Sequence, residues 1–145
     1  GRIKEILVTS TGEKISPVDI ESALETLPLF RQAYAVGDGM PYIAVLISLD
    51  PTLWEKFAAD QGVDPKDLES LHAPVVRKKI LEMVKKACRT FPAYAVPKNL
   101  ALTLDEWTID NGLLTPTLKL KRSPMQARYG HLIEEMYKGA KKSRI

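Results

Sequence analysis

The chain has 145 residues, which is enough for one domain with a buried core and short for two. Its 45% hydrophobic and 27% charged residues are ordinary for a globular protein, and its formal net charge at pH 7 is +3. No apolar run approaches the roughly 20 residues of a membrane-spanning helix, and the charged start does not resemble a signal peptide. Because the first residue is not methionine, we expect a fragment or a processed product.

The basic residues are unevenly distributed, since 15 of the 21 Lys and Arg residues follow residue 74. A basic second half can bind phosphates, an anionic membrane surface or nucleic acid. Most of these cations can equally lie on solvent-exposed helix faces without binding anything. The single cysteine, Cys88, excludes an intrachain disulfide and is predicted to be a small core residue. His72 and His131 have no motif around them and are predicted to be structural or exposed.

In chain order, the first half of the sequence predicts a hairpin, a helix and two strands. These elements are a β-hairpin over 3–15, a helix from Ser16-Pro17 to Pro28, and strands over 32–36 and 42–49. Gly12 permits the tight turn of the hairpin. The second strand is apolar on both faces, so we expect it in the middle of a sheet.

The second half predicts mainly helices. Its elements are short helices from Asp50-Pro51 and Asp64-Pro65, a helix from Pro74 to Pro92, a strand over 98–104, an extended segment over 113–120 and a last helix from Ser123-Pro124. Most of these starts combine a capping side chain with proline at the first helical position. The helix from Pro74 is predicted to be the longest, and Gln126 is placed to complete a capping box. Together the elements predict one α/β (α+β) domain, a small sheet with an N-terminal hairpin, covered by helices.

Two segments carry patterns more specific than packing requires. The first, residues 1–21, begins Gly-Arg-Ile-Lys-Glu, turns at Gly12 and ends Ser-Pro-Val-Asp-Ile-Glu. The second, residues 111–122, ends with Lys119, Lys121 and Arg122 within four residues. Cations on an exposed loop are suited to contact a phosphate held by another domain. We expect nothing in this chain to hold that loop rigidly.

These segments resemble the adenylate-forming enzymes, which include acyl-CoA synthetases, aryl-CoA ligases and firefly luciferase. The first segment is similar to their hinge motif. The second is similar to their catalytic-lysine motif, in the form of the long-chain fatty acyl branch rather than the commoner Pro-Lys-Thr-x-Ser-Gly-Lys. The resemblance covers almost the whole chain. It implies that residues 1–145 are the mobile C-terminal domain of an AMP-forming long-chain fatty acyl-CoA synthetase, beginning at the interdomain hinge, with the large N-terminal domain absent.

The resemblance also implies roles for the cations of both segments. Lys119 aligns with the lysine that lies between the substrate carboxylate and the α-phosphate of ATP, where it stabilises the transition state. Lys121 and Arg122 stay open as alternatives, because the motif departs from the commoner form. Lys4 aligns with the hinge about which the domain swings between adenylation and thioester formation. Arg2 aligns with an arginine that contacts the ribose of the nucleotide.

The hairpin is implied to serve the second step. Gly12 would line the pantetheine tunnel, where the absence of a side chain allows close approach, and Lys14 would lie near the thioester-forming site. The implied cofactors of the full-length enzyme are ATP, Mg²⁺ and CoA. We expect none of them bound to this chain alone, and we assign it no metal ligands.

The implied partners are fatty acid, ATP and CoA, acting through the missing N-terminal domain, and not nucleic acid. We expect a monomeric, cytoplasmic protein and leave open a peripheral association with a membrane. One alternative within the family is a fatty acyl-AMP ligase that loads a carrier protein. An alternative from another class is a basic nucleic-acid or membrane-binding module, although the aromatic residues do not interleave with the cations as a base-stacking surface requires.

Overall fold

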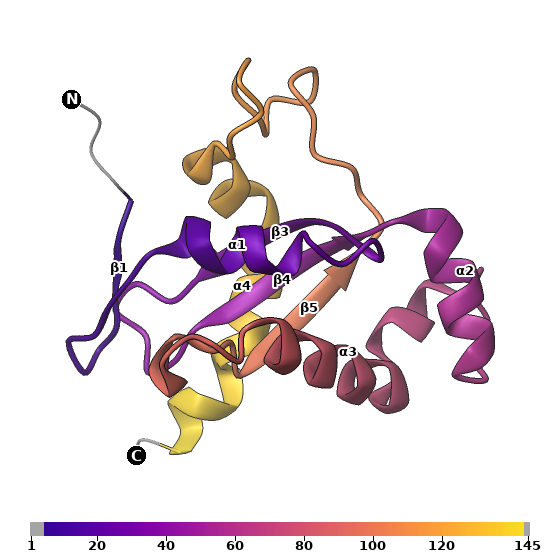
Figure 1. The fold of residues 1–145 in the computed structure, drawn as a ribbon, viewed down its shortest axis with the longest axis horizontal. Coiled ribbons are helices and arrows are strands. Elements are labelled where there is room, and N and C mark those ends of the chain that lie inside the picture. The colour runs from indigo at the N-terminus through magenta and orange to yellow at the C-terminus, as the bar shows by residue number, and fades with distance from the viewer. Residues whose placement is uncertain (1–4, 144–145) are drawn as a thin grey trace.

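The structure is a computed structural model that describes the backbone of residues 5–143 and the side chains of residues 5–138. Within this part the chain forms the predicted mixed α/β domain (Figure 1). The strands are β1 (Leu7–Val8), β2 (Lys14–Ile15), β3 (Phe30–Val36), β4 (Ala44–Leu49) and β5 (Asn99–Thr103). The helices are α1 (Pro17–Leu24), α2 (Pro51–Asp60), α3 (Pro74–Ala87) and α4 (Arg122–Ser143), with 3-10 turns η1 (Leu68–His72) and η2 (Ala93–Ala95).

Strand β4 lies at the centre of the larger sheet, whose strand order is β3-β4-β5. It pairs antiparallel with β3 and parallel with β5. All six of its residues are buried, because side chains cover both faces of the sheet. This confirms the prediction that the strand that is apolar on both faces lies in the middle of the sheet.

The two faces of the sheet pack against different helices. Val45 and Ile47 of β4 point into a core with side chains of α1, α2 and α3, whereas Ala44 and Leu46 point to the other side, toward α4. Figure 1 shows α4 behind the sheet and the other three helices in front of or beside it. The sheet therefore separates two hydrophobic clusters, and the second cluster carries the segment that leads from β5 to α4.

The N-terminal hairpin is present but short. Strands β1 and β2 pair antiparallel over two residues each, and Gly12 occupies the turn with φ +93°. The hairpin contacts the turn between β3 and β4, where Ser10 N–H donates to the Met40 carbonyl at 2.9 Å and Gly39 N–H donates to the Val8 carbonyl at 2.7 Å. These two hydrogen bonds fix the hairpin relative to the larger sheet.

The predicted helix starts are mostly confirmed. Asp50 caps α2, since its carboxylate accepts a hydrogen bond from Leu53 N–H at 3.0 Å. Ser16 precedes α1 in an extended conformation, with Pro17 at the first position, but its side chain makes no capping hydrogen bond. Asp64 begins a turn rather than a helix, and η1 begins at Leu68 after the capping carboxylate of Asp67.

The helix ends differ from the prediction. Helices α1 and α3 end at Leu24 and Ala87, several residues before Pro28 and Pro92. Tight turns follow directly, in which Leu27 N–H donates to the Leu24 carbonyl at 3.1 Å and Phe91 N–H donates to the Cys88 carbonyl at 3.0 Å. Helix α4 spans 22 residues, but it is broken at Tyr129, whose φ of −112° and ψ of 17° are not helical. Among the described helices without such a break, the 14-residue α3 is the longest.

Helix α4 also begins one residue earlier than predicted. It starts at Arg122, which places Ser123 in the first turn instead of at the capping position, and the capping box with Gln126 is not formed. Its apolar stripe is confirmed, because Met125, Tyr129 and Met136 are buried against the sheet.

Candidate functional site

Residues 111–122, called the lysine loop below, fold back on themselves instead of forming the predicted extended segment. Leu114 and Leu120 form an isolated antiparallel bridge. Between them, Thr115 N–H donates to the Lys119 carbonyl at 2.8 Å, and the Thr115 hydroxyl accepts a hydrogen bond from Lys119 N–H at 3.1 Å. The extended conformation is therefore lost, because Thr115 supplies the hydrogen-bonding groups of a tight turn.

The expectation that nothing holds this loop was wrong. Its base is fixed by Leu113 and Leu114, which are buried in the second hydrophobic cluster, and Lys121 N–H donates to the Leu113 carbonyl at 2.9 Å. At the tip, Leu118 adopts φ 65° and is 67% exposed. Thr115 accepts a backbone hydrogen bond from Leu118 at 2.8 Å, which closes the turn. The loop thus has a fixed base and an exposed tip.

The three cations of the loop have different surroundings. Lys119 and Lys121 are exposed, and among the described side chains neither ammonium group has an ion-pair or hydrogen-bond partner. Arg122, in contrast, is mostly buried and forms two hydrogen bonds with Glu21, at 2.7 Å and 2.8 Å. Its Nε also donates to Glu5. The structure therefore identifies Arg122 as a paired residue and leaves Lys119 and Lys121 free to meet an anion.

The carboxylate of Glu21 has a second role besides its ion pair. It accepts a hydrogen bond from the backbone N–H of Ala35 on β3 at 2.8 Å. Burial raises the pKa of Glu21 above its ordinary value, although Arg122 and the Ala35 N–H oppose the shift. The Arg122 guanidinium also lies over the ring of Tyr34, 5.8 Å from its centroid. Helices α1 and α4 are joined to β3 at this point.

A pocket of about 570 Å³ lies between the lysine loop and α1. Leu118 and Lys119 line it from the loop, Val18 and Asp19 line it from α1, and Glu5 lines it from the start of the described chain. Lys119 thus borders a hollow that is open to a ligand or to another domain. This pocket brings together residues from both sequence motifs.

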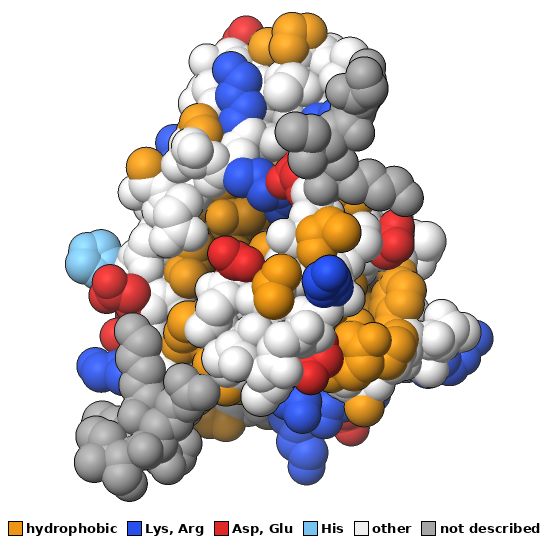
Figure 2. Space-filling model, turned by 90° about the vertical axis from the view of Figure 1, so that its left-hand side faces the viewer, with side chains coloured by type: hydrophobic (Ala, Val, Ile, Leu, Met, Phe, Trp, Pro, Cys, Tyr) orange, Lys and Arg blue, Asp and Glu red, His pale blue; other side chains and the backbone are white. Residues whose placement is uncertain are grey.

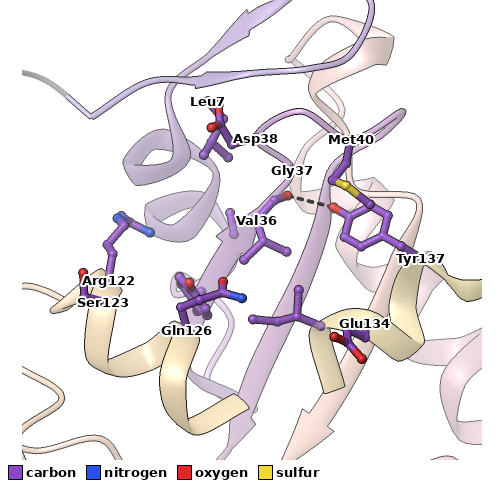
Figure 3. A pocket seen from close by; sticks show the side chains of 13 residues that line it. Leu7, Val36, Gly37, Asp38, Met40, Arg122, Ser123, Gln126, Glu134 and Tyr137 are labelled. Carbon is purple, nitrogen blue, oxygen red and sulfur yellow. Dashed lines mark hydrogen bonds between the residues drawn. The ribbon is translucent and has the colours of Figure 1, made fainter. Parts of the chain in front are cut away.

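A second pocket, of about 440 Å³, lies on the other side of Arg122 (Figure 3). Figure 3 shows Arg122 and Ser123 at one side of it and Met40 and Tyr137 at the other. The Tyr137 hydroxyl donates to the Val36 carbonyl at 3.2 Å. Arg122 lines both pockets and therefore lies at the boundary between them.

The hairpin residues are placed apart from Lys119. Figure 1 shows the turn of the hairpin at the left of the domain and the lysine loop at the top. A Cβ atom at Gly12 would meet no atom within 4 Å among the described residues, so within this domain the glycine serves its backbone conformation, φ +93°. Lys14 is exposed on β2. Lys14 and Lys119 line two different pockets, and Ser16 and Asp19 line both of them.

Arg2 and Lys4 lie outside the described residues. Glu5, which follows them, makes the ion pair with Arg122 that joins the two motif segments. No pattern in the sequence marks Glu5 or Glu21 as a partner of Arg122. The available signal was that both glutamates carry a charge opposite to that of Arg122. Because Glu5 and Glu21 are 117 and 101 residues away from Arg122 in sequence, only the fold brings them together.

Figure 2 shows the face that bears the N-terminal end of the domain. Its Lys and Arg side chains are scattered among hydrophobic and acidic ones instead of forming a continuous basic band. A nucleic-acid-binding surface would have a continuous basic patch. The excess of cations in the second half of the sequence produces no such patch on this face.

Comparison with known proteins places the domain in a family. Residues 4–141 match the family model described as AMP-binding enzyme C-terminal domain. The chain belongs to this family. The match includes Lys4, the hairpin and the whole lysine loop, so it confirms the resemblance on which the sequence analysis relied.

Two relatives of this AMP-binding C-terminal domain are acyl-CoA ligases. The long-chain-fatty-acid–CoA ligase FadD15 of Mycobacterium tuberculosis is 31% identical over 94% of this chain. A peroxisomal acyl-CoA ligase of Penicillium roqueforti is 33% identical over 96% of this chain. The chain spans only 23% and 21% of the length of these two relatives. Each of them therefore contains a large part that has no counterpart here.

The fold of the domain is also found in solved adenylation domains. The A domain of a carboxylic acid reductase from Segniliparus rugosus, in complex with AMP and a co-purified carboxylic acid, has a TM-score of 0.76 and 26% identity. The match covers 94% of this chain and 20% of that chain. The A-PCP didomain of the same enzyme gives the same TM-score and identity, over 96% of this chain and 18% of that chain. The AMP-binding C-terminal domain is thus a mixed α/β domain of the adenylate-forming type.

Cys88, His72 and His131 are the other side chains that could carry chemistry. Cys88 is fully buried, and burial raises the pKa of its thiol to about 11, so it stays protonated and cannot act as a nucleophile near neutral pH. His72 and His131 are both exposed. Among the described residues there is no group of three His, Cys, Asp or Glu side chains that could hold a metal ion.

Proposed function

We propose that this domain belongs to a long-chain fatty acid–CoA ligase that joins a fatty acid to AMP with release of pyrophosphate and then transfers the acyl group to CoA. The observation that carries the proposal is the geometry of Lys119. Its ammonium group is exposed and unpaired within the described part of the chain, on a loop whose base is fixed and whose tip borders a pocket. The printed names of the two relatives support the substrate class.

Lys119 is proposed to act in adenylate formation. The carboxylate of the fatty acid and the α-phosphate of ATP are both anionic, so their approach needs a cation that neutralises the charge of the transition state. A lysine on a loop with a fixed base is pre-positioned for this task. Lys121 remains the competing candidate, but it lies at the base of the loop, where its backbone is bonded to Leu113.

The separation of the hairpin from the lysine loop supports a two-step mechanism (Figure 1). A rotation of the domain about Lys4 would withdraw Lys119 after adenylation and present the other end, with Gly12 and Lys14, to the thioester step. In this proposal Arg2 contacts the ribose of the nucleotide.

ATP, CoA and Mg²⁺ are part of the proposal for the whole enzyme. Among the described residues, no three His, Cys, Asp or Glu side chains lie together in a way that could hold a metal ion. We expect the isolated chain to fold as a monomer, to bind ATP weakly and to have little activity, because the remaining contacts belong to the large domain. Within the described residues, no helix combines the length and apolar character needed to cross a membrane.

We propose separately that the whole enzyme is cytoplasmic, with peripheral membrane association as a further expectation.

A second candidate is a fatty acyl-AMP ligase whose acyl acceptor is a carrier protein instead of CoA. It is favoured by the similarity to the A domain of a carboxylic acid reductase, because the structure of the A-PCP didomain of that enzyme matches this chain as well. The two candidates share the adenylation step and the role of Lys119. Supplying the full-length enzyme with CoA or with a carrier protein that bears a free phosphopantetheine thiol distinguishes them by which thiol is acylated as AMP leaves.

The test of the proposal is the exchange of pyrophosphate into ATP by the full-length enzyme. Lys119→Ala should slow this exchange on the order of 10²–10³-fold, because it removes a preorganised charge. Thioester formation from supplied acyl adenylate should be affected much less. The matched control is Lys138→Ala, which removes an exposed lysine of α4 that pairs with Glu135 at 3.7 Å.

Near wild-type exchange in Lys119→Ala would reject the assignment. If Lys121→Ala were the damaging change instead, the catalytic lysine would lie two residues further along the chain. Absence of exchange in the wild-type enzyme with fatty acids of every chain length would reject the proposed activity as a whole.

A further inference from the structure

Arg122 joins three parts of the domain that are distant in sequence. It is the first residue of α4, and its guanidinium lies between Glu21 of α1 and Glu5 of the segment that precedes β1. The same group lies over the ring of Tyr34 on β3. Arg122, Glu21 and Glu5 are called the Arg122 cluster below.

The cluster is built from strong, directional contacts. Both terminal nitrogens of Arg122 donate to the two oxygens of Glu21, at 2.7 Å and 2.8 Å, in the fork geometry that only arginine offers. Glu21 is itself held by the Ala35 N–H of the edge strand at 2.8 Å. The position of Arg122 is thereby fixed to the sheet and to α1 at the same time.

This fixed position determines where the lysine loop ends. Arg122 is three residues after Lys119. Lys121, directly before Arg122, lies at the base of the loop, where its N–H donates a hydrogen bond to the Leu113 carbonyl. The other end of the loop is held by Leu113 and Leu114, which are buried. Only the tip between these two fixed ends remains exposed.

We propose that Arg122 is a positioning residue for adenylate formation: its pairs with Glu21 and Glu5 hold the lysine loop in one orientation relative to the segment that follows the hinge. This inference rests on the proposed function of Lys119. When the domain swings about the hinge, Lys119 must arrive at the reacting atoms with a defined geometry, and a misplacement of about 1 Å can cost on the order of 10²-fold in rate.

The contacts argue against a direct role of Arg122 on the nucleotide. Its Nε, Nη1 and Nη2 all donate to carboxylates, and two acidic groups balance its single charge. A phosphate would have to displace Glu21, which is mostly buried and would lose its partner. The Lys119 ammonium group has no carboxylate partner among the described side chains, so a phosphate can approach it without displacing one.

The experiment compares Arg122→Gln, Arg122→Lys and Arg128→Gln in the full-length enzyme. Arg128 is the matched control: it lies on the same helix, over the ring of Tyr129 at 5.9 Å, and within the described part of the chain its one ion pair is a 4.0 Å contact with Asp105. We expect Arg122→Gln to lower the kcat of pyrophosphate exchange on the order of 10²-fold, with the KM for ATP within about twofold. Arg122→Lys should lose less, and Arg128→Gln should stay within about twofold.

The decisive measurement adds each change to Lys119→Ala. If Arg122 acts by placing Lys119, then Arg122→Gln should slow the Lys119→Ala enzyme no further, because the group that it positions is already absent. Additive losses, or a large rise in the KM for ATP, would overturn the inference and indicate direct contact with the nucleotide. Thermal unfolding of each variant shows whether the enzyme is folded, and Arg122→Lys, which keeps the charge, provides the test if Arg122→Gln does not fold.

The proposed function can fail separately. If Lys119→Ala alone exchanges pyrophosphate at the wild-type rate, the role of Lys119 is wrong. Amide hydrogen exchange of the lysine loop in this chain would still report on the Arg122 cluster: faster exchange at Lys119 and Lys121 in Arg122→Lys supports the structural part, and unchanged exchange rejects it.

Discussion

The carboxylate of Glu25 accepts a hydrogen bond from the backbone N–H of Ala33 at 2.9 Å. One helical turn earlier, Glu21 makes the same contact with Ala35 at 2.8 Å. Ala33 and Ala35 lie on β3, which is an edge strand of the larger sheet. Glu21 of α1 and Glu25, the residue that caps the C-terminus of α1, therefore satisfy N–H groups that an edge strand would otherwise leave unpaired.

The first prediction follows from this contact. Glu25→Ala should destabilise the domain by about 1–3 kcal/mol, because it leaves the Ala33 N–H without its acceptor. Glu25→Gln keeps an acceptor oxygen and should cost less. Urea denaturation of this chain measures both values. Ser22→Ala is the control on the same helix, at an exposed position, and should change the stability by less than about 0.5 kcal/mol.

A second prediction concerns the turn that carries the hairpin. At Gly37 a Cβ atom would lie 2.5 Å from Ile43 Cδ1 and 3.2 Å from the Tyr42 carbonyl oxygen, and Ile43 is buried. We expect Gly37→Ala to cost about 2–4 kcal/mol, from overpacking and backbone strain together. At Gly39, with φ +72°, a Cβ atom would meet nothing within 4 Å among the described residues, so Gly39→Ala should cost only about 1–2 kcal/mol of backbone strain. Thermal unfolding shows which of the two variants loses more stability. An equal loss of stability in both would contradict the packing argument.

A third prediction concerns Cys88 and high pH. The thiol ionises near 9.0 when exposed and at about 11 in the folded domain, because burial disfavours the thiolate. Between these pH values the unfolded chain releases a proton that the folded chain keeps. The free energy of unfolding should therefore fall as the pH rises above 9, by up to about 1.4 kcal/mol for each unit of pKa difference.

The measurement for Cys88 is the urea midpoint at pH 8, 10 and 11. Cys88→Ala lacks the ionisable group and should lose less stability over this range than the wild-type chain. The thiol should also react with a disulfide reagent at pH 8 only after denaturation. Rapid reaction of the folded chain would show that the thiol is accessible.

The fourth prediction concerns the proposed hinge. Lys4→Pro fixes φ near −65° and removes an N–H, so it should restrict the rotation between the two half-reactions. We expect it to suppress CoA thioester formation more than pyrophosphate exchange in the full-length enzyme. Lys4→Ala, which keeps the backbone freedom, should separate this effect from the loss of the charge. An equal loss in both half-reactions, with the protein folded, would mean that position 4 is not the pivot.

The sequence by itself determined the elements whose signals are local. A capping carboxylate followed by proline placed the start of α2 at Pro51, and a run that is apolar on both faces placed β4 in the middle of the sheet. Both signals lie within a few neighbouring residues, so no knowledge of the fold is needed to read them. The two motifs likewise identified the family, because their residue types and order are visible in the chain itself.

Which cation of the lysine loop is free depends on contacts between distant segments. In sequence, Lys119, Lys121 and Arg122 are equivalent charges on one segment. Arg122 differs because Glu21 and Glu5 reach it from 101 and 117 residues away. The same holds for the loop itself, which the packing of Leu113 and Leu114 against the sheet draws back into a closed turn. An ion pair between distant segments depends on how the whole core packs, and no local pattern encodes that.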